Sequence, residues 1–214
     1  MHGPECRCTS SHALRRVVLT GGPGAGKTAV LEVVRKNFCR HVVVLPEAAS
    51  IIFGGGFPRG ASVRARKAAQ RAICRVQWEL EETAQEQDGA AVVLCDRGTV
   101  DGAAYWPGPV DESWAEVGST SARELARYDC VIHLRTPLDS GGYNHANPVR
   151  TESNRQALDI DARIADAWAG HPHRHFVERH HDFLQKVAEA LRLLRGEVPA
   201  CCRPEVPGLV DSPP

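Results

Sequence analysis

The stretch Gly21-Gly22-Pro23-Gly24-Ala25-Gly26-Lys27-Thr28 follows the apolar run Val17-Val18-Leu19 and leads into a second apolar segment, residues 29–34. It fits the pattern of a Gly, four free positions, then Gly-Lys-Thr. Glycines let backbone N–H groups approach an anion closely, and the following helix adds its positive N-terminus. We therefore predict that residues 21–28, the phosphate loop, bind a nucleoside triphosphate. Lys27 is expected to reach the β- and γ-phosphates, and the Thr28 hydroxyl to ligate Mg²⁺.

The composition is that of an ordinary globular chain. Its 214 residues suit one α/β domain with tails, and 43% of them are hydrophobic and 24% charged. The formal net charge is zero, so whole-molecule electrostatics predicts no nucleic-acid partner. Residues 1–12 lack the apolar run of a signal peptide, and no later segment has the length of a transmembrane helix. We therefore expect a cytoplasmic protein.

The eight cysteines fall into two groups. Four lie inside apolar periodic segments, where they are expected to be small buried side chains in a reducing compartment: Cys39, Cys74, Cys95 and Cys130. The other four lie in the tails: Cys6, Cys8, Cys201 and Cys202. A metal clip with His2 or His12 is conceivable there, but the spacing matches no zinc pattern and favours free thiols.

Apolar strand-like runs alternate with segments of helical spacing, which predicts a parallel sheet covered by helices on both faces. Strands are expected at residues 17–20, 41–45, 90–95, 130–134 and 175–177. Helices are expected after the phosphate loop, from Ser62, at 119–126, from Ser153 and from Asp182, with 99–114 irregular. The last helix is expected to turn Phe183, Val187, Leu191 and Leu194 inward. The folded domain is expected at 13–196, between a flexible leader (1–12) and a Pro-rich disordered tail (197–214).

In parallel sheets of this kind, ligands bind outside the carboxyl ends of the strands. That rule brings together the phosphate loop, Glu47, Asp96-Arg97 and the segment after Leu134. Asp96 is expected to hold the Mg²⁺ shell opposite Thr28, although an Asp after a strand can also cap a helix or form a turn. Arg97 can contact phosphate or acceptor, or form an ion pair.

Three further charged residues are candidates for chemistry. Glu47 can accept the proton of an attacking hydroxyl, or cap a helix that starts near Ala48. Arg150 and Arg155 flank a mobile loop and a helix start, where guanidinium groups can close over the transferring phosphoryl group. Arg155 can instead pair with Asp159 on a solvated helix face.

A basic run follows Glu47, because no acid occurs before Glu79. On the helix from Ser62, Arg64, Lys67, Arg71 and Arg75 recur every three or four positions and form what we call the basic stripe. Such a stripe is usually a solvated face, but it can also meet a phosphorylated acceptor or anionic lipid headgroups. A histidine cluster occurs later in the chain: His171, His173, His175, His180 and His181. Three of these alternate along the expected strand and are expected to face both its sides, which disfavours a shared metal.

Several motifs occur in a specific order along the chain. They are residues 19–28, Pro46-Glu47-Ala48-Ala49, Asp96-Arg97-Gly98, Asn147-Pro148-Val149-Arg150-x-Glu152 and Asp161-Ala162-Arg163-x₄-Trp168-x₂-His171-Pro172. From about Leu14 to Leu194 the chain resembles AAA-domain P-loop proteins related to the NadR ribosylnicotinamide kinase domain. The phosphate loop is generic, whereas the arginine-rich segment with Trp-x-x-His-Pro makes the resemblance specific.

The resemblance implies a P-loop NTPase three-layer α/β sandwich with a mainly parallel sheet, like nucleoside and nucleotide kinases, and a helical lid carrying Arg150 and Arg155. It implies ATP (or GTP) with Mg²⁺ and a small-molecule acceptor near Glu47. Asp96-Arg97 is similar to the Asp-Arg pair of small-molecule kinases. The leading hypothesis is phosphoryl transfer from ATP to a hydroxyl of a nucleoside-like metabolite. The alternative is a nucleotide-gated regulatory module that hydrolyses slowly and contacts an anionic partner or phospholipid.

Overall fold

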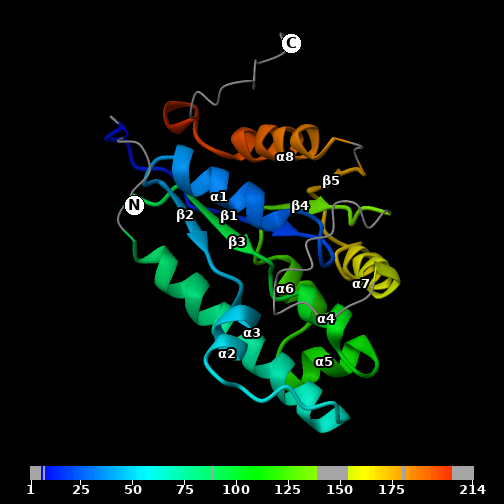
Figure 1. Cartoon of the computed structure of the whole chain (residues 1–214). Coiled ribbons are helices and arrows are strands. Elements are labelled where there is room, and N and C mark those ends of the chain that lie inside the picture. Colours follow the sequence, from blue (N-terminus) through cyan, green and yellow to red (C-terminus); the bar gives the residue numbers. More distant parts are fainter. Residues whose placement is uncertain (1–5, 7, 88, 139–153, 180–181, 204–214) are drawn as a thin grey trace.

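The computed structural model describes residues 6, 8–87, 89–138, 154–179 and 182–203, and a parallel sheet lies at its centre (Figure 1). The sheet has five strands in the order β2-β3-β1-β4-β5, and each neighbouring pair is parallel. The strands are β1 Arg15–Thr20, β2 Val42–Leu45, β3 Val92–Asp96, β4 Cys130–Leu134 and β5 Arg174–Val177. The predicted α/β architecture is confirmed.

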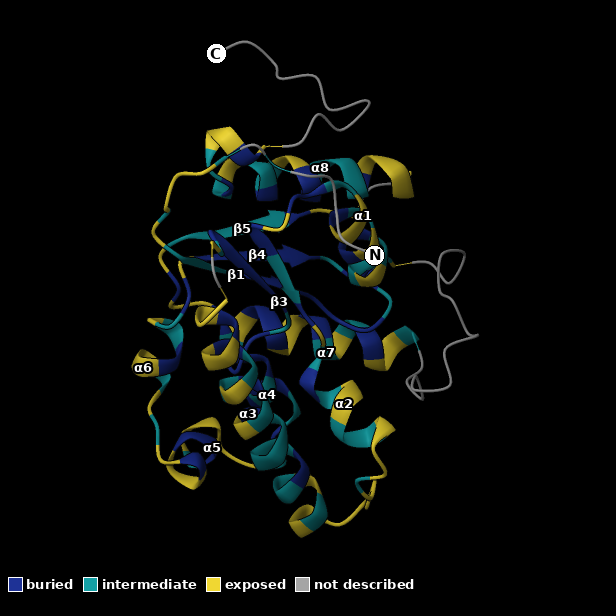
Figure 2. Cartoon of the chain, turned by 90° about the vertical axis from the view of Figure 1, so that its left-hand side faces the viewer, coloured by how far each residue is buried: buried dark blue, intermediate teal, exposed yellow. Residues whose placement is uncertain are grey.

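Helices cover both faces of the sheet, which gives three layers (Figures 1 and 2). One face carries α1 (Lys27–Asn37) and α8 (Phe183–Glu197). The other face carries α3 (Val63–Gln85), α4 (Asp101–Tyr105) and α7 (Asn154–Ala167), with α5 (Val110–Val117) and α6 (Ser121–Leu125) beside them. The short α2 (Ala48–Gly54) packs on α3. No helix in the described part of the chain is both long and apolar enough to cross a membrane.

Strand periodicity divides the core in two. Val17 and Leu19 of β1 pack with α1 and α8, whereas Val18 between them packs with α3 and α7. All five residues of β4 are buried, as a parallel strand covered on both faces requires. Ser62 caps α3 as expected, because its hydroxyl accepts a hydrogen bond from the Ala65 N–H at 3.2 Å.

The segment 99–114 is not irregular, as the sequence suggested, but contains α4 and most of α5. Helix α5 nevertheless has ordinary start and stop signals in its sequence. Pro109 precedes it, Asp111 and Glu112 lie in its first turn where acids favour the helix dipole, and Gly118 ends it in the left-handed conformation at φ 75°.

Three of the four residues of the basic stripe contact α5, whereas Arg64 is exposed. Lys67 forms ion pairs with Glu112 and Glu116, and Arg71 Nη1 lies 2.9 Å from Glu116 Oε2. Arg75 donates to the carbonyl of Val117 at 3.0 Å. These partners lie more than forty residues further along the chain, outside the segment between Glu47 and Glu79 that contains no acids.

Two other expectations differ from the structure. Val198 and Cys202, in the expected tail, are 1% and 4% exposed, and a short 3₁₀ helix, η2 (Ala200–Cys202), continues the fold past residue 196. His173 and His175 lie on the same side, with their Nε2 atoms 2.9 Å apart, because alternate residues of a strand share a face. The expectation that they face opposite sides is wrong. His171 is separate and buried, with Nε2 2.9 Å from the carbonyl of Tyr128.

A buried carboxylate at the start of α4 connects four parts of the fold. Asp101 is 2% exposed and accepts hydrogen bonds from the Thr20 hydroxyl at the end of β1 and from the Gly98 N–H at 3.0 Å. It also accepts from Trp168 Nε1, just after α7, at 3.1 Å, and from Arg97 Nη1 at 3.2 Å. Since a buried charge is tolerated only when it is paired, these four donors hold Asp101 in place.

Replacement of Asp101 tests this connection. We expect Asp101→Asn to lower the free energy of unfolding by about 2–4 kcal/mol, because it removes the charge that Arg97 pairs with and mismatches two donors. Urea denaturation followed by circular dichroism measures the change. Asp111→Asn is the matched control, since Asp111 also lies in the first turn of a helix but is exposed. Equal losses in the two variants would contradict the role of Asp101.

Candidate functional site

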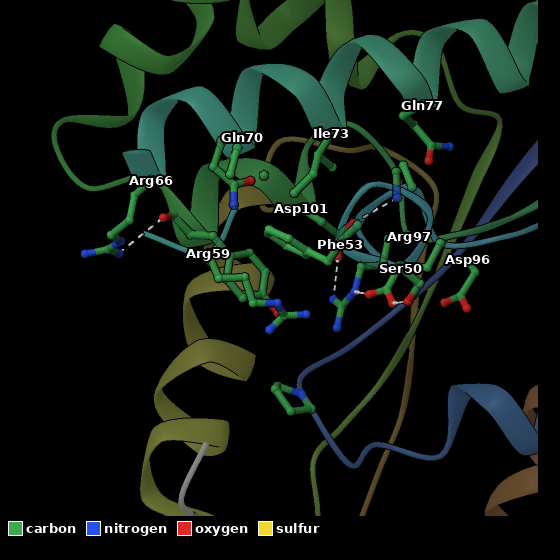
Figure 3. Close-up of a pocket in the computed structure, with 18 of the residues that line it drawn as sticks. Ser50, Phe53, Arg59, Arg66, Gln70, Ile73, Gln77, Asp96, Arg97 and Asp101 are labelled. Carbon is green, nitrogen blue, oxygen red and sulfur yellow. Dashed lines mark hydrogen bonds and ion pairs between the residues drawn. The ribbon is translucent and has the colours of Figure 1, made fainter. Parts of the chain in front are cut away.

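A cavity of about 580 Å³ opens at the carboxyl ends of β1, β2 and β3 (Figure 3). Its lining includes seven of the predicted site residues: Pro23, Gly24, Lys27, Thr28, Glu47, Asp96 and Arg97. Segments that are far apart in the sequence thus meet at one edge of the sheet, as the rule for parallel sheets predicts.

The phosphate loop has the backbone that its glycines permit. Gly21 has φ 133°, and a Cβ there would lie 2.1 Å from the carbonyl oxygen of Leu134, so a side chain cannot be accommodated. Lys27 Nζ donates to the carbonyls of Gly21 at 2.9 Å and Gly22 at 3.3 Å. Burial, with a smaller contribution from the charge of Arg97, lowers the pKa of Lys27 to about 8. The loop therefore holds its own lysine over the surface where phosphate is expected.

Arg97 joins the phosphate loop to the residues after β2. Its Nε lies 2.7 Å from Glu47 Oε1, and its Nη1 donates to the Gly21 carbonyl at 3.1 Å and to Asp101 at 3.2 Å. Its φ of 70° is the one positive value of a non-glycine residue in the described ranges. Such a backbone is costly and persists only where surrounding contacts hold it.

Glu47 is the residue for which sequence left two roles open. It precedes α2, but its side chain makes no capping hydrogen bond. Its carboxylate instead accepts from Arg97 and, at 2.5 Å, from the Ser50 hydroxyl. Burial raises the pKa of Glu47, but the charges of Arg97 and Lys27 outweigh burial and hold it at about 2. Glu47 is therefore an ionised hydrogen-bond acceptor at the cavity wall.

Asp96 is a carboxylate that has room for a further ligand. Its Oδ1 is buried and has no hydrogen-bond partner among the described residues. Burial raises the pKa of Asp96, and the charge of Lys27 opposes this only in part. The exposed hydroxyl of Thr28 lines the same cavity. An unpaired buried carboxylate oxygen and a hydroxyl are ligands that suit Mg²⁺.

The far part of the cavity lies between α2 and α3, and sequence reasoning missed it. Figure 3 shows Gln70, Ile73 and Gln77 projecting from α3 on the side of the cavity, with Phe53 of α2 nearby. Tyr105 of α4 lines it too, and Arg59 stacks over the Phe53 ring at 4.1 Å. The helical period of α3 did indicate that Ile73 is on its inner side. The two glutamines on that side were the available signal of a polar ligand.

A second residue that sequence reasoning did not single out is Asp161 of α7. It is 1% exposed, accepts the Gly22 N–H at 2.9 Å, and lies 2.9 Å from His133 Nε2. Burial raises the pKa of Asp161, but the hydrogen bonds from His133 and Gly22 outweigh this effect and lower it to about 2. Asp161 therefore fixes α7 to the phosphate loop. The one signal was its place in the motif Asp161-Ala162-Arg163.

Of the two predicted lid residues, only Arg155 is among the residues that the structure describes. Arg155 is exposed and lies outside the lining that the described residues form. Arg150 and the capping residue Ser153 lie outside the described residues.

Phe183 is not turned inward as expected but is 51% exposed, and its ring lies against Gly26, where a Cβ would be 2.9 Å from Phe183 Cε2.

Comparison with known proteins gives a family for this fold and site. A family model described as an AAA domain matches residues 16–186, which include the phosphate loop, Asp96-Arg97 and α7. A comparison with curated proteins found no match. Since the family match covers most of the chain and the phosphate loop has the conformation described above, the chain belongs to the AAA-domain family of P-loop NTPase-type nucleotide-binding proteins.

Proposed function

We propose that the protein is a Mg²⁺-dependent phosphotransferase that moves the γ-phosphoryl group of ATP to a hydroxyl of a small nucleoside-like molecule. The observation that carries this proposal is the shape of the cavity. It continues from the phosphate loop into its far part between α2 and α3, which we call the chamber. Its volume of about 580 Å³ is in the range of small-molecule sites. A triphosphate at the loop and an acceptor in the chamber would meet beside Glu47 and Arg97.

The phosphate side uses residues of the loop and of β3. Backbone N–H groups of residues 21–28 would bind the phosphates, and Lys27 would exchange its contacts with Gly21 and Gly22 for phosphate oxygens. Thr28 and Asp96 would hold Mg²⁺, which offsets charge on the phosphates when it is bound. The Arg97 guanidinium, already within reach of the Gly21 carbonyl, would stabilise charge that develops during transfer.

The acceptor side centres on Glu47. Its carboxylate keeps lone pairs free beyond those used by Arg97 and Ser50, so it can also accept a substrate hydroxyl. With a pKa of about 2, Glu47 orients the hydroxyl more than it deprotonates it. That suffices, because phosphoryl transfer passes through a loose transition state in which positioning matters most. The acceptor oxygen bonds to the γ-phosphorus, the bond to the β–γ bridging oxygen breaks, ADP leaves, and the hydroxyl proton passes to the carboxylate.

The chamber suits a flat, polar ring. Phe53, Ile73 and Tyr105 offer apolar and aromatic surface, and the amides of Gln70 and Gln77 offer both hydrogen-bond donors and acceptors. This combination supports a nucleoside-like acceptor. The resemblance to ribosylnicotinamide kinases supports the same class of acceptor. From that resemblance we also propose that Arg150 and Arg155 belong to a lid over the transferring phosphoryl group.

The alternative function, a regulatory module that contacts an anionic partner or lipid, depended on the basic stripe. Lys67 and Arg71 are already paired with Glu112 and Glu116 of α5. A stripe in which two of the four charges are already paired within the domain attracts anions less strongly. The kinase proposal is therefore preferred.

The role of Glu47 is tested by Glu47→Gln. We expect nucleoside-dependent ATP consumption to fall by about 10²–10⁴-fold, because the neutral amide replaces the charged acceptor that orients the hydroxyl and cannot take up its proton, while ATP affinity changes little. A coupled ADP assay against a panel of nucleosides measures the first quantity, and calorimetry the second. Glu112→Gln is the control and should keep full activity, because Glu112 pairs with Lys67 and does not line the cavity. Unchanged turnover in Glu47→Gln would contradict the proposal.

The role of Lys27 predicts a pH dependence of triphosphate binding. The ammonium must be protonated to pair with phosphate, and its pKa in the free protein is about 8. Bound phosphate raises that pKa, so affinity is highest below about pH 8 and falls by up to tenfold per pH unit above it. Calorimetric titration between about pH 7.5 and 9.5, where the triphosphate is fully ionised, measures this slope.

Lys27→Arg separates this effect from others. Arginine keeps its charge throughout that range, so any affinity that Lys27→Arg retains should not vary with pH. If the wild-type protein and Lys27→Arg gave the same pH profile, the dependence would not arise from Lys27.

A further inference from the structure

Seven cysteine and histidine side chains gather at the amino ends of the strands, at the opposite end of the sheet from the cavity. They come from three segments: residues 6–12, residues 39–41 just before β2, and η2 near the end of the described chain. In Figure 1 the N-terminal segment, drawn in blue, lies beside η2, drawn in orange-red. These side chains form two groups that share one member, Cys202.

The first group consists of Cys6, Cys39, His41 and Cys202. Their ligand atoms all lie within 4.8 Å of one another. Cys6 Sγ and Cys202 Sγ are 3.7 Å apart, Cys39 Sγ and His41 Nδ1 are 3.6 Å apart, and His41 Nδ1 and Cys202 Sγ are 3.1 Å apart. Three of the four residues are buried, and Cys6 is half-buried.

The second group consists of Cys8, His12, Cys201 and Cys202, and its ligand atoms also lie within 4.8 Å of one another. His12 Nε2 lies 3.3 Å from Cys8 Sγ and 3.4 Å from Cys201 Sγ. Cys201 Sγ and Cys202 Sγ are 3.8 Å apart. This group is closer to the surface, since Cys201 is exposed.

We propose that these seven side chains bind two Zn²⁺ ions, each in a tetrahedral site, with the Cys202 thiolate bridging them. In a tetrahedron with zinc–sulfur bonds of about 2.3 Å, two sulfurs lie about 3.8 Å apart, and a sulfur and a nitrogen about 3.5 Å apart. The distances in both groups lie within about 0.5 Å of these values, and the shortest sulfur–sulfur separation is the 3.3 Å between Cys8 and Cys201. Thiolate and imidazole are the ligands that tetrahedral Zn²⁺ prefers.

The ligand count fits two ions. Each group supplies four ligands, one histidine and three cysteines, when Cys202 is counted in both. The five thiols release their protons to the buffer on binding, and two divalent cations nearly balance the five thiolate charges. Disulfide bonds are the rival interpretation of paired sulfurs. They would leave one of the five thiols unpaired and would give no role to His12 and His41, whose nitrogens face the sulfurs.

Zinc would fasten the two ends of the described chain to each other and to the segment before β2. Cys6 and Cys8 already pack against the core that includes Val198 and Cys202. Metal bonds there would add to the stability of this edge of the domain, because ligands brought together by folding bind the ion only in the folded state.

The zinc content of the full chain tests the proposal. Protein purified with a phosphine reductant should contain two Zn²⁺ per chain by plasma mass spectrometry, and Cys202→Ser should lose both after dialysis, because each site then keeps only three ligands. Cys74→Ser and His175→Ala are matched controls and should retain two ions. Cys74 is a buried thiol of α3 outside both groups, and His175 belongs to a third cluster, with Cys130, His173 and Glu197.

A second measurement does not depend on a variant that folds. Metal-stripped wild-type protein titrated with Co²⁺ should develop the intense visible bands of tetrahedral cobalt and the near-ultraviolet sulfur-to-cobalt bands, saturating at two equivalents. Weak octahedral bands would overturn the proposal, and so would saturation at one equivalent. So would unchanged zinc in Cys202→Ser, or disulfide bonds found by peptide mapping without reductant in place of bound metal.

Discussion

The site depends on one largely buried cation, whose side chain is 14% exposed. Arg97 lies between two carboxylates, Glu47 after β2 and Asp101 in α4, and also contacts the phosphate loop through the Gly21 carbonyl. Each partner belongs to a different element, so this guanidinium sets the distance between the loop and the chamber wall. Because charges removed from water need partners, loss of Arg97 would leave two acids in a partly desolvated site. The strained backbone at Arg97 is the local cost of placing the cation there.

The sequence predicted the parts of this arrangement that follow local rules. The phosphate loop has a fixed spacing, and the ends of parallel strands must share an edge, so Glu47 and Asp96-Arg97 could be placed beside it. What it could not predict depends on contacts between distant segments. Asp161 acts through Gly22, about 140 residues away in sequence, and the acids that pair with Lys67 and Arg71 of the basic stripe lie on α5. The chamber exists only because α2 and α3 pack beside each other.

The cysteines show the same limit in sharper form. Zinc patterns are recognised by short spacings within one loop, whereas these ligands come from segments separated by as many as 196 residues. The spacing of the tail cysteines in the sequence therefore favoured free thiols over a metal site. The parallel sheet brings the start of β2 near the end of α8, and η2 then supplies two adjacent thiols to that edge. The chemistry at this edge is separate from that of the cavity, because the two lie at opposite ends of the strands.

The contact between Trp168 and Asp101 has an optical consequence. The indole is completely buried and hydrogen-bonded to a carboxylate that also pairs with Arg97. Indole emission responds to the electric field around the ring, so movement of the Arg97 charge would shift the emission maximum or intensity of Trp168. The molecule thus carries an intrinsic reporter, one residue removed from the cavity wall, through which events at the phosphate loop can be followed without a label.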